Sequence, residues 1–232
     1  MSLELLRFSD EDSWIDAFLA TLRGLFRNAI GQGQSVFHMS LSGGSTPGAL
    51  YKALAADGDC SELSERLEIH CWVGDEREVP ADSPQRNGRL IQTILGEPCG
   101  WKNPPVLHLW PEGGRINASR AYSEELRRCM GKAPVFDLAL LGMGTDGHTA
   151  GLFSREDTSG CRTDPLCLPT LAPSEPRLRM TMSAQLLRAS RCSLLLLKGE
   201  DKAAVVDTLL SSSAWLPVRE ALSDITKVFL LA

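Results

Sequence analysis

The residues with the clearest chemical potential are an aspartate and a histidine in one glycine-rich turn. Asp146 and His148 follow the apolar run 135–141 and stand beside the glycines of Gly-Met-Gly-Thr-Asp-Gly, residues 142–147. An imidazole can take a proton from water near neutral pH, and a neighbouring carboxylate can fix its tautomer and position. Ligands of open α/β sheets bind beyond the carboxyl ends of the strands. The segment therefore predicts an active-site turn, with His148 as the base and Asp146 as its orienting group.

Two other interpretations of this turn compete with catalysis. Residues 142–147 match the Gly-x-Gly-x-x-Gly fingerprint of dinucleotide binding. The match lies in the middle of the chain, and His148 occupies the region where the cofactor-bearing helix should begin, so we reject a dinucleotide site. A buried structural imidazole is the other interpretation, but the neighbouring glycines offer His148 little side-chain packing, which favours function.

A second glycine-rich turn, in residues 41–48, has the composition of an anion site. An apolar run ends there in two glycines and two hydroxyl residues, and a helix-like stretch follows. The unpaired amides and positive dipole at the start of a helix favour phosphate. No Gly-Lys-Ser/Thr follows, which argues against a nucleotide P-loop, while an ordinary turn with a Ser or Thr cap stays an alternative. The candidate anion-binding residues are Ser42, Gly43, Gly44, Ser45 and Thr46.

Charged residues near three further strand ends extend the candidate site. If the fold brings these ends together, their side chains could hold one anionic ligand. For each residue taken alone, a structural salt bridge or a solvated surface charge is the competing interpretation. The candidates are Asp75 and Arg77 after the run 67–73, Arg179 in the run 178–182, and Lys202 after the run 193–197.

These residues require a scaffold of alternating strands and helices. The pattern predicts an α/β fold in which helices cover both faces of a mostly parallel sheet. The polar stretch 154–177, with four prolines, predicts a loop that could act as a flap. We expect a cap at Ser9 or Asp10 for the first helix. The expected strands are residues 36–41, 67–73, 106–109, 135–141, 178–182, 193–197 and 228–231, and the expected helices are 10–28, 47–56, 118–130 and 201–210.

Length and composition bound the class of protein. The chain has 232 residues, of which 43% are hydrophobic and 23% charged, so we expect one domain over residues 1–232. A net charge of −5 argues against a general nucleic-acid binder. No membrane span or signal segment is apparent, which predicts a cytoplasmic protein. The seven cysteines include no Cys-x-x-Cys pair, which favours reduced thiols over a metal site.

Several of these motifs together resemble one known family. Residues 41–47, 75–77, 142–153 and 199–202 are similar, in this order, to the glucosamine-6-phosphate isomerase/6-phosphogluconolactonase family, and closest to its lactonase branch. The resemblance implies a three-layer, modified Rossmann-like sheet and hydrolysis of a sugar-phosphate lactone, 6-phospho-D-glucono-1,5-lactone, without a cofactor or metal. It also implies that phosphate binds at the 42–46 turn with Arg179 and Lys202. We expect Arg77 to contact the substrate's polar groups or its carbonyl. We expect a monomer or a weak homodimer.

The chain departs from the family pattern at two places. Members commonly carry Ser-Asn after the Asp-Glu-Arg block, whereas this chain has Arg86 and Asn87, so that Asn87 alone matches as a candidate substrate-binding residue. The usual Ala-Ser-Leu-Phe-Pro is here Ala-Gly-Leu-Phe-Ser, residues 150–154. The Phe-Asn-Glu-Pro block typical of the deaminase branch is absent. An amino-sugar-phosphate isomerase or deaminase, with Asp75 as base, and a non-catalytic sugar-phosphate sensor are the alternatives.

Overall fold

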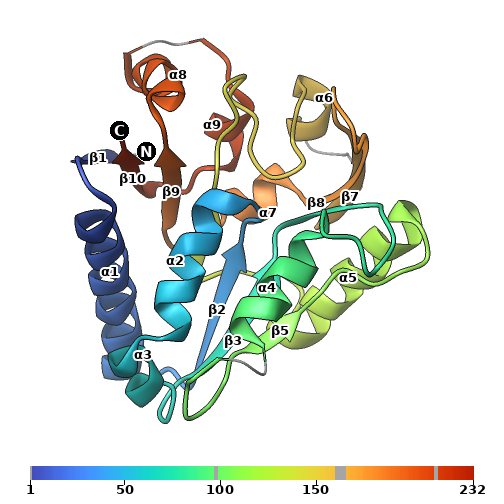
Figure 1. Ribbon diagram of the computed structural model, residues 1–232. Coiled ribbons are helices and arrows are strands. Elements are labelled where there is room, and N and C mark those ends of the chain that lie inside the picture. Colours follow the sequence, from blue (N-terminus) through green and yellow to red (C-terminus); the bar gives the residue numbers. More distant parts are fainter. Residues whose placement is uncertain (1, 97–98, 160–165, 212–213) are drawn as a thin grey trace.

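A parallel sheet forms the centre of the computed structural model, which describes residues 2–96, 99–159, 166–211 and 214–232 (Figure 1). Within these residues the large sheet has seven strands in the order β1-β10-β9-β6-β2-β3-β5, and every neighbouring pair is parallel. The predicted α/β class and mostly parallel sheet are confirmed. In sequence order its strands are β1 (Ser2–Phe8), β2 (Val36–Leu41), β3 (Glu68–Val73), β5 (Val106–His108), β6 (Leu138–Leu141), β9 (Ser193–Lys198) and β10 (Ile225–Leu231).

The chain adds strands to this sheet in two opposite directions, and the two halves meet at the neighbouring strands β2 and β6. The chain moves along the sheet from β1 to β2, β3 and β5, and then returns through β6, β9 and β10. Right-handed crossovers place the helices of the two halves on opposite faces. Helices α1 (Glu11–Gly31), α2 (Ser45–Ala55) and α4 (Asn87–Leu95) belong to the first half and pack in a row, with the short α3 (Gly58–Leu63) against α1 (Figure 1). The neighbours β2 and β6 therefore mark the switch point, where an open α/β sheet binds its ligand.

The other layer comes mostly from segments that follow β5 in the sequence. Helix α5 (Arg115–Met130) packs against a small antiparallel sheet, in which β8 (Leu178–Met182) pairs with both β4 (Asp75–Arg77) and β7 (Cys167–Leu171). The short helices α6 (Arg155–Thr158), α7 (Ala184–Arg188) and α9 (Pro217–Ala221) contact one another. Helix α8 (Glu200–Ser211) follows β9.

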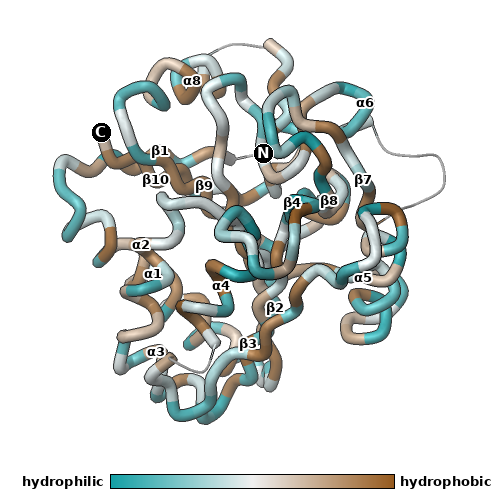
Figure 2. The backbone as a smooth tube through the Cα atoms, turned by 45° about the vertical axis from the view of Figure 1, so that its right-hand side comes forward, coloured by the Kyte–Doolittle hydropathy of each residue, from teal (hydrophilic) through white to brown (hydrophobic). Residues whose placement is uncertain are grey.

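The apolar pattern explains the strongest of these elements. Strand β6 is buried along its whole length, and β9 is buried except for its last residue, as expected for strands covered on both faces. Figure 2 shows β9 and β10 as hydrophobic segments. The α1 helix begins where Asp10 accepts a hydrogen bond from the Ser13 amide at 2.8 Å, and it buries a stripe that includes Trp14, Phe18 and Phe26. Among the described helices, none combines the length and apolar character needed to cross a bilayer.

Two sequence expectations about the region after residue 153 were wrong. The stretch 154–177 is not an unbroken loop, because it contains α6 and β7; its residues 160–165 lie outside the described part. Strand β8 belongs to the small sheet instead of the parallel one. The sequence did not predict β7 because this segment contains Pro169. In the described structure β7 pairs with β8 alone, at the edge of the small sheet, where a proline is tolerated.

Candidate active site

A pocket of about 330 Å³ opens beyond the carboxyl ends of β2, β6 and β9, beside the switch point of the sheet. Its walls come from segments that are distant in the sequence: the turns after β2 and β6, the small sheet, the end of β9, and the starts of α4 and α8. All but one of the predicted site residues line it; the exception is Asp146, which is bonded to a lining residue. Those that line it are Ser42, Gly43, Gly44, Ser45, Thr46, Asp75, Arg77, Asn87, His148, Arg179 and Lys202.

The turn that carries the histidine is held by its own backbone and by α9. The Gly144 amide donates to the His148 carbonyl at 2.8 Å, and Thr149 Oγ1 donates to the Gly142 carbonyl at 2.7 Å. Any side chain on Gly144 would collide, because its Cβ would lie 2.2 Å from His148 Nδ1. Gly147 has a φ of +80° and its carbonyl accepts from the Val218 amide. The glycines thus allow the tight turn that brings carboxylate and imidazole together.

Asp146 and His148 form a direct pair at the pocket. Asp146 Oδ1 lies 2.6 Å from His148 Nδ1 and also accepts from the His148 amide at 3.1 Å. Burial acts to raise the pKa of Asp146, but the hydrogen bonds from His148 outweigh it, and the pKa lies below its ordinary value. Among the described residues, His148 Nε2 has no hydrogen-bond partner, and the side chain is 36% exposed. The imidazole is therefore oriented through one nitrogen and open at the other.

The turn after β2 presents uncapped amides to the pocket. Helix α2 begins at Ser45, two residues before the predicted Pro47, and its N-cap Gly44 has a φ of +104° and no capping side chain. The alternative of a turn capped by a Ser or Thr side chain is therefore wrong. Ser42 Oγ is buried without a hydrogen-bond partner in the described structure, while the Ser42 carbonyl accepts from Tyr51 at 2.9 Å. Free donors at a helix start are the requirement for an anion site.

Two arginines and an aspartate meet through the small sheet. Arg77 is paired with Arg179 in the antiparallel register, so the start of β8 lies beside the end of β4. Arg179 Nη1 lies 4.0 Å from Asp75 Oδ2. Burial raises the pKa of Asp75, an effect that Arg77 and Arg179 partly offset, and burial together with Arg77 lowers the pKa of Arg179. Lys202 reaches the same pocket from α8.

Some pocket residues were not singled out from the sequence. The Phe153 ring lies 4.9 Å from the His148 ring, centroid to centroid, and 6.0 Å beneath the Arg179 guanidinium. Lys198 ends β9 at the pocket, where its ammonium lies 3.1 Å from Glu11. The sequence could have indicated Lys198 as a pocket residue, because it ends an apolar strand. No spacing in the sequence indicated Phe153. The lining also includes Pro47, Gly142, Met143, Gly144, Thr149, Ala150, Leu196 and Leu197.

This arrangement defines a Rossmann-like α/β protein with an aspartate–histidine pair beside a pocket that is lined by cations, at the switch point of its sheet. The family model described as glucosamine-6-phosphate isomerases/6-phosphogluconolactonase matches residues 9–229, and the chain therefore belongs to this family.

Individual relatives and solved structures agree with this membership. The chain is 32% identical over 195 residues to the human GDH/6PGL endoplasmic bifunctional protein, covering 82% of this chain but 24% of that protein. The chain thus spans about a quarter of that relative. It is 30% identical over 177 residues to the 6-phosphogluconolactonase of Haemophilus influenzae, covering 76% and 75% of the two chains. The crystal structure of 6-phosphogluconolactonase from Thermotoga maritima superimposes with a TM-score of 0.84 at 27% identity, covering 99% of each chain.

Proposed function

We propose that this chain hydrolyses 6-phospho-D-glucono-1,5-lactone to 6-phospho-D-gluconate. The observation that carries the proposal is the His148 imidazole, which Asp146 holds at 2.6 Å and which opens on a pocket lined by arginine, lysine and helix-start amides. The pocket offers a base and an anion site to one small molecule. The names of the relatives supply the substrate, since several of them are 6-phosphogluconolactonases.

In the proposed reaction, His148 Nε2 takes a proton from a water molecule as its oxygen attacks the lactone carbonyl. The oxyanion that forms then expels the ring oxygen, which receives the proton from the imidazolium, so that the ester bond is broken and a carboxylic acid and a hydroxyl remain. The Asp146 carboxylate keeps the Nδ1 proton in place and stabilises the positive ring. Arg77, which faces the same pocket, is our candidate for stabilising the oxyanion.

The substrate phosphate is assigned to the turn after β2 and to two cations. The amides of residues 43–46 and the Ser42 hydroxyl supply donors, and Arg179 and Lys202 supply charge. These groups hold the phosphate equally in the ground state and the transition state. Arg179→Met is therefore expected to raise KM more than it lowers kcat. A fall in kcat with unchanged KM would contradict the assignment.

A second candidate is an isomerase or deaminase of an amino-sugar phosphate, since the family description includes isomerases. The observation that favours it is the burial of Asp75, whose raised pKa suits a proton-shuttling base. Release of ammonia from glucosamine 6-phosphate would reveal this activity. We also infer that the chain acts as one domain, since the family model spans nearly its full length.

The test follows the decay of freshly generated 6-phosphogluconolactone in three samples: buffer alone, the protein and its His148→Ala variant. The buffer sample matters because the lactone also hydrolyses unaided. Enzymatic decay that falls by about 10²–10⁴-fold in the variant would support the proposal. Decay no faster than in buffer would overturn it and direct attention to the amino-sugar phosphates.

A further inference from the structure

A fully buried carboxylate, Glu76, organises the segment next to the pocket. Its Oε1 accepts from the amides of Arg77 and Asn87, both at 2.8 Å, and its Oε2 accepts from the Gly88 amide at 2.7 Å. Asn87 and Gly88 are the first two residues of α4, and the N-cap residue Arg86 makes no capping bond with its own side chain. Glu76 therefore caps α4 from another element of the fold, in place of the residue that normally does so.

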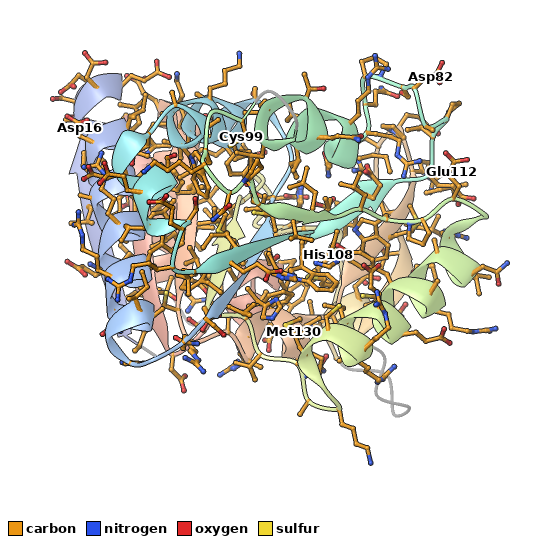
Figure 3. All side chains as sticks on the ribbon, turned by 90° about the horizontal axis from the view of Figure 1, so that it is seen from below. Asp16, Asp82, Cys99, His108, Glu112 and Met130 are labelled. Carbon is orange, nitrogen blue, oxygen red and sulfur yellow. The ribbon has the colours of Figure 1, made fainter. Side chains whose placement is uncertain are left out.

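Arg86 supplies the counter-charge for this carboxylate. Its Nε lies 3.6 Å from Glu76 Oε2, its Nη2 donates to the Trp110 carbonyl at 3.0 Å, and its side chain is 10% exposed. Burial raises the pKa of Glu76, and the three amide bonds act against that rise. A buried carboxylate without a partner is costly, so the guanidinium favours the charged form. Asp82 and Glu112, labelled in Figure 3, line an adjacent hollow with Arg86, and Glu78 lines a second hollow with it. The Asp75 carboxylate also raises the pKa of Glu76, and Arg179 is a second cation that interacts with Glu76.

The capped helix start carries a side chain that reaches into the pocket. Asn87 Nδ2 donates to the Asp75 carbonyl at 2.8 Å and lies 3.3 Å from Asp75 Oδ1. Its Oδ1 lies against Gly43 so closely that a Cβ there would be 1.9 Å away. Asn87 thus joins the Asp75 strand to the turn after β2, and its position depends on the backbone that Glu76 holds.

We propose that Glu76 and Arg86 are a positioning pair for the substrate pocket: Glu76 fixes the start of α4, Arg86 keeps Glu76 charged, and together they hold Asn87 between Asp75 and Gly43. The kinetic consequence rests on the proposed lactonase function. The placement of Asn87 does not, because it is a property of the free protein.

The first measurement compares KM and kcat of the wild type with Arg86→Met, which keeps much of the side-chain volume without the charge. We expect KM to rise about tenfold and kcat to change less than threefold, since the pocket is displaced but His148 is untouched. We also expect a new pH dependence. Without Arg86, Glu76 takes up a proton at a higher pH than in the wild type, so KM should rise further as the pH is lowered.

Three further variants separate positioning from general loss of stability. Arg86→Lys keeps the charge and should restore KM to within about threefold of the wild type. In Glu76→Gln/Arg86→Met the new pH dependence should vanish, because the titrating group is gone. Arg23→Met is the matched control: Arg23 lies 2.6 Å from Asp57, a carboxylate that caps α3 far from the pocket, so its loss should lower thermal stability and leave KM unchanged.

An NMR measurement keeps the test independent of activity. In the wild type, the side-chain amide of Asn87 should exchange its hydrogens slowly because Asp75 accepts its bond. Arg86→Met should accelerate this exchange at least tenfold, and Arg23→Met should not. Unchanged exchange, or a KM that moves equally in Arg23→Met, would overturn the proposal. An inactive wild type with the expected exchange would overturn the lactonase assignment alone.

Discussion

The side-chain oxygen of Asn87 occupies the space that a side chain on Gly43 would need. The Cβ of an alanine at position 43 would lie 1.9 Å from Asn87 Oδ1 and 2.0 Å from its Cγ. Asn87 cannot withdraw freely, because its amide is bonded to Asp75. The candidate phosphate turn and the Asp75 strand are therefore in contact through a single amide group.

Gly43→Ala is expected to lower kcat/KM at least tenfold, since either the turn or Asn87 must move. In the Asn87→Ala background the same substitution should cost much less, because the obstructing amide is absent. The measurement is a double-mutant cycle on kcat/KM. Additive effects of the two substitutions would show that the contact does not matter.

Asp146→Asn is expected to reduce kcat about 10²–10⁴-fold, because the carboxamide neither fixes the Nδ1 proton of His148 nor stabilises a positive ring. KM should change less than threefold, since Asp146 does not line the pocket. The pKa of Asp146 lies below its ordinary value, so the carboxylate is ionised throughout pH 5–9 and the defect should persist over that range. A variant with more than a tenth of wild-type kcat would exclude the orienting role.

His38 should make the protein less stable in mild acid. Burial, with a contribution from His70, lowers its pKa from 6.5 to about 4, and its Nδ1 accepts from the Trp72 indole at 3.2 Å. Trp72 also stacks on His108, which Figure 3 labels. The unfolded chain binds a proton near pH ~6.5, whereas folded His38 does so only near pH 4, so the unfolded state holds more protons between these values.

The free energy of unfolding should therefore fall as the pH is lowered from 6.5 towards 4, and His38→Gln should make this fall less steep. Urea unfolding of both proteins at several pH values in this range checks the sign. Parallel pH curves for the two proteins would contradict it.

Gly151→Ser, which introduces the residue common at this position in the family, should destabilise this chain by about 1–3 kcal/mol through overpacking. A Cβ at position 151 would lie 2.8 Å from the Thr181 Cβ and 3.2 Å from Thr170 Oγ1. Both threonines already bond to the Gly151 backbone, at 3.1 and 2.7 Å, which ties the histidine turn to the small sheet. Gly24→Ser is the control, since its Cβ would meet nothing within 4 Å. Equal thermal stability of both variants would refute the close fit.

The sequence predicted those parts whose signal is local. The α1 helix was readable because Trp14, Phe18, Leu22 and Phe26 recur every four residues after a capping aspartate. The pairing of Asp146 with His148 follows from a spacing of two residues in a turn. Strand β4 was missed because it has only three residues, all charged, and no periodicity.

Other features depend on contacts between distant parts of the chain. Arg179 lies beside Arg77 only because β8 pairs with β4 in antiparallel register. The two strands are about a hundred residues apart in the sequence, so local propensity could not predict their pairing. Arg86 differs from the family's common serine, and its partner Glu76 becomes evident only when β4 and α4 are seen together. The roles of the site residues remain predictions.

The order of strands in the large sheet also bears on how the chain is made. Strand β1, at one edge of this sheet, is synthesised before the sheet's other strands, whereas its neighbour β10 is synthesised after them. The seven residues of β1 therefore gain their hydrogen-bonding partner only after residues 225–231 have been synthesised. A nascent chain stalled before residue 225 should hold the β2–β3–β5 half of the molecule with its leading strand still unpaired.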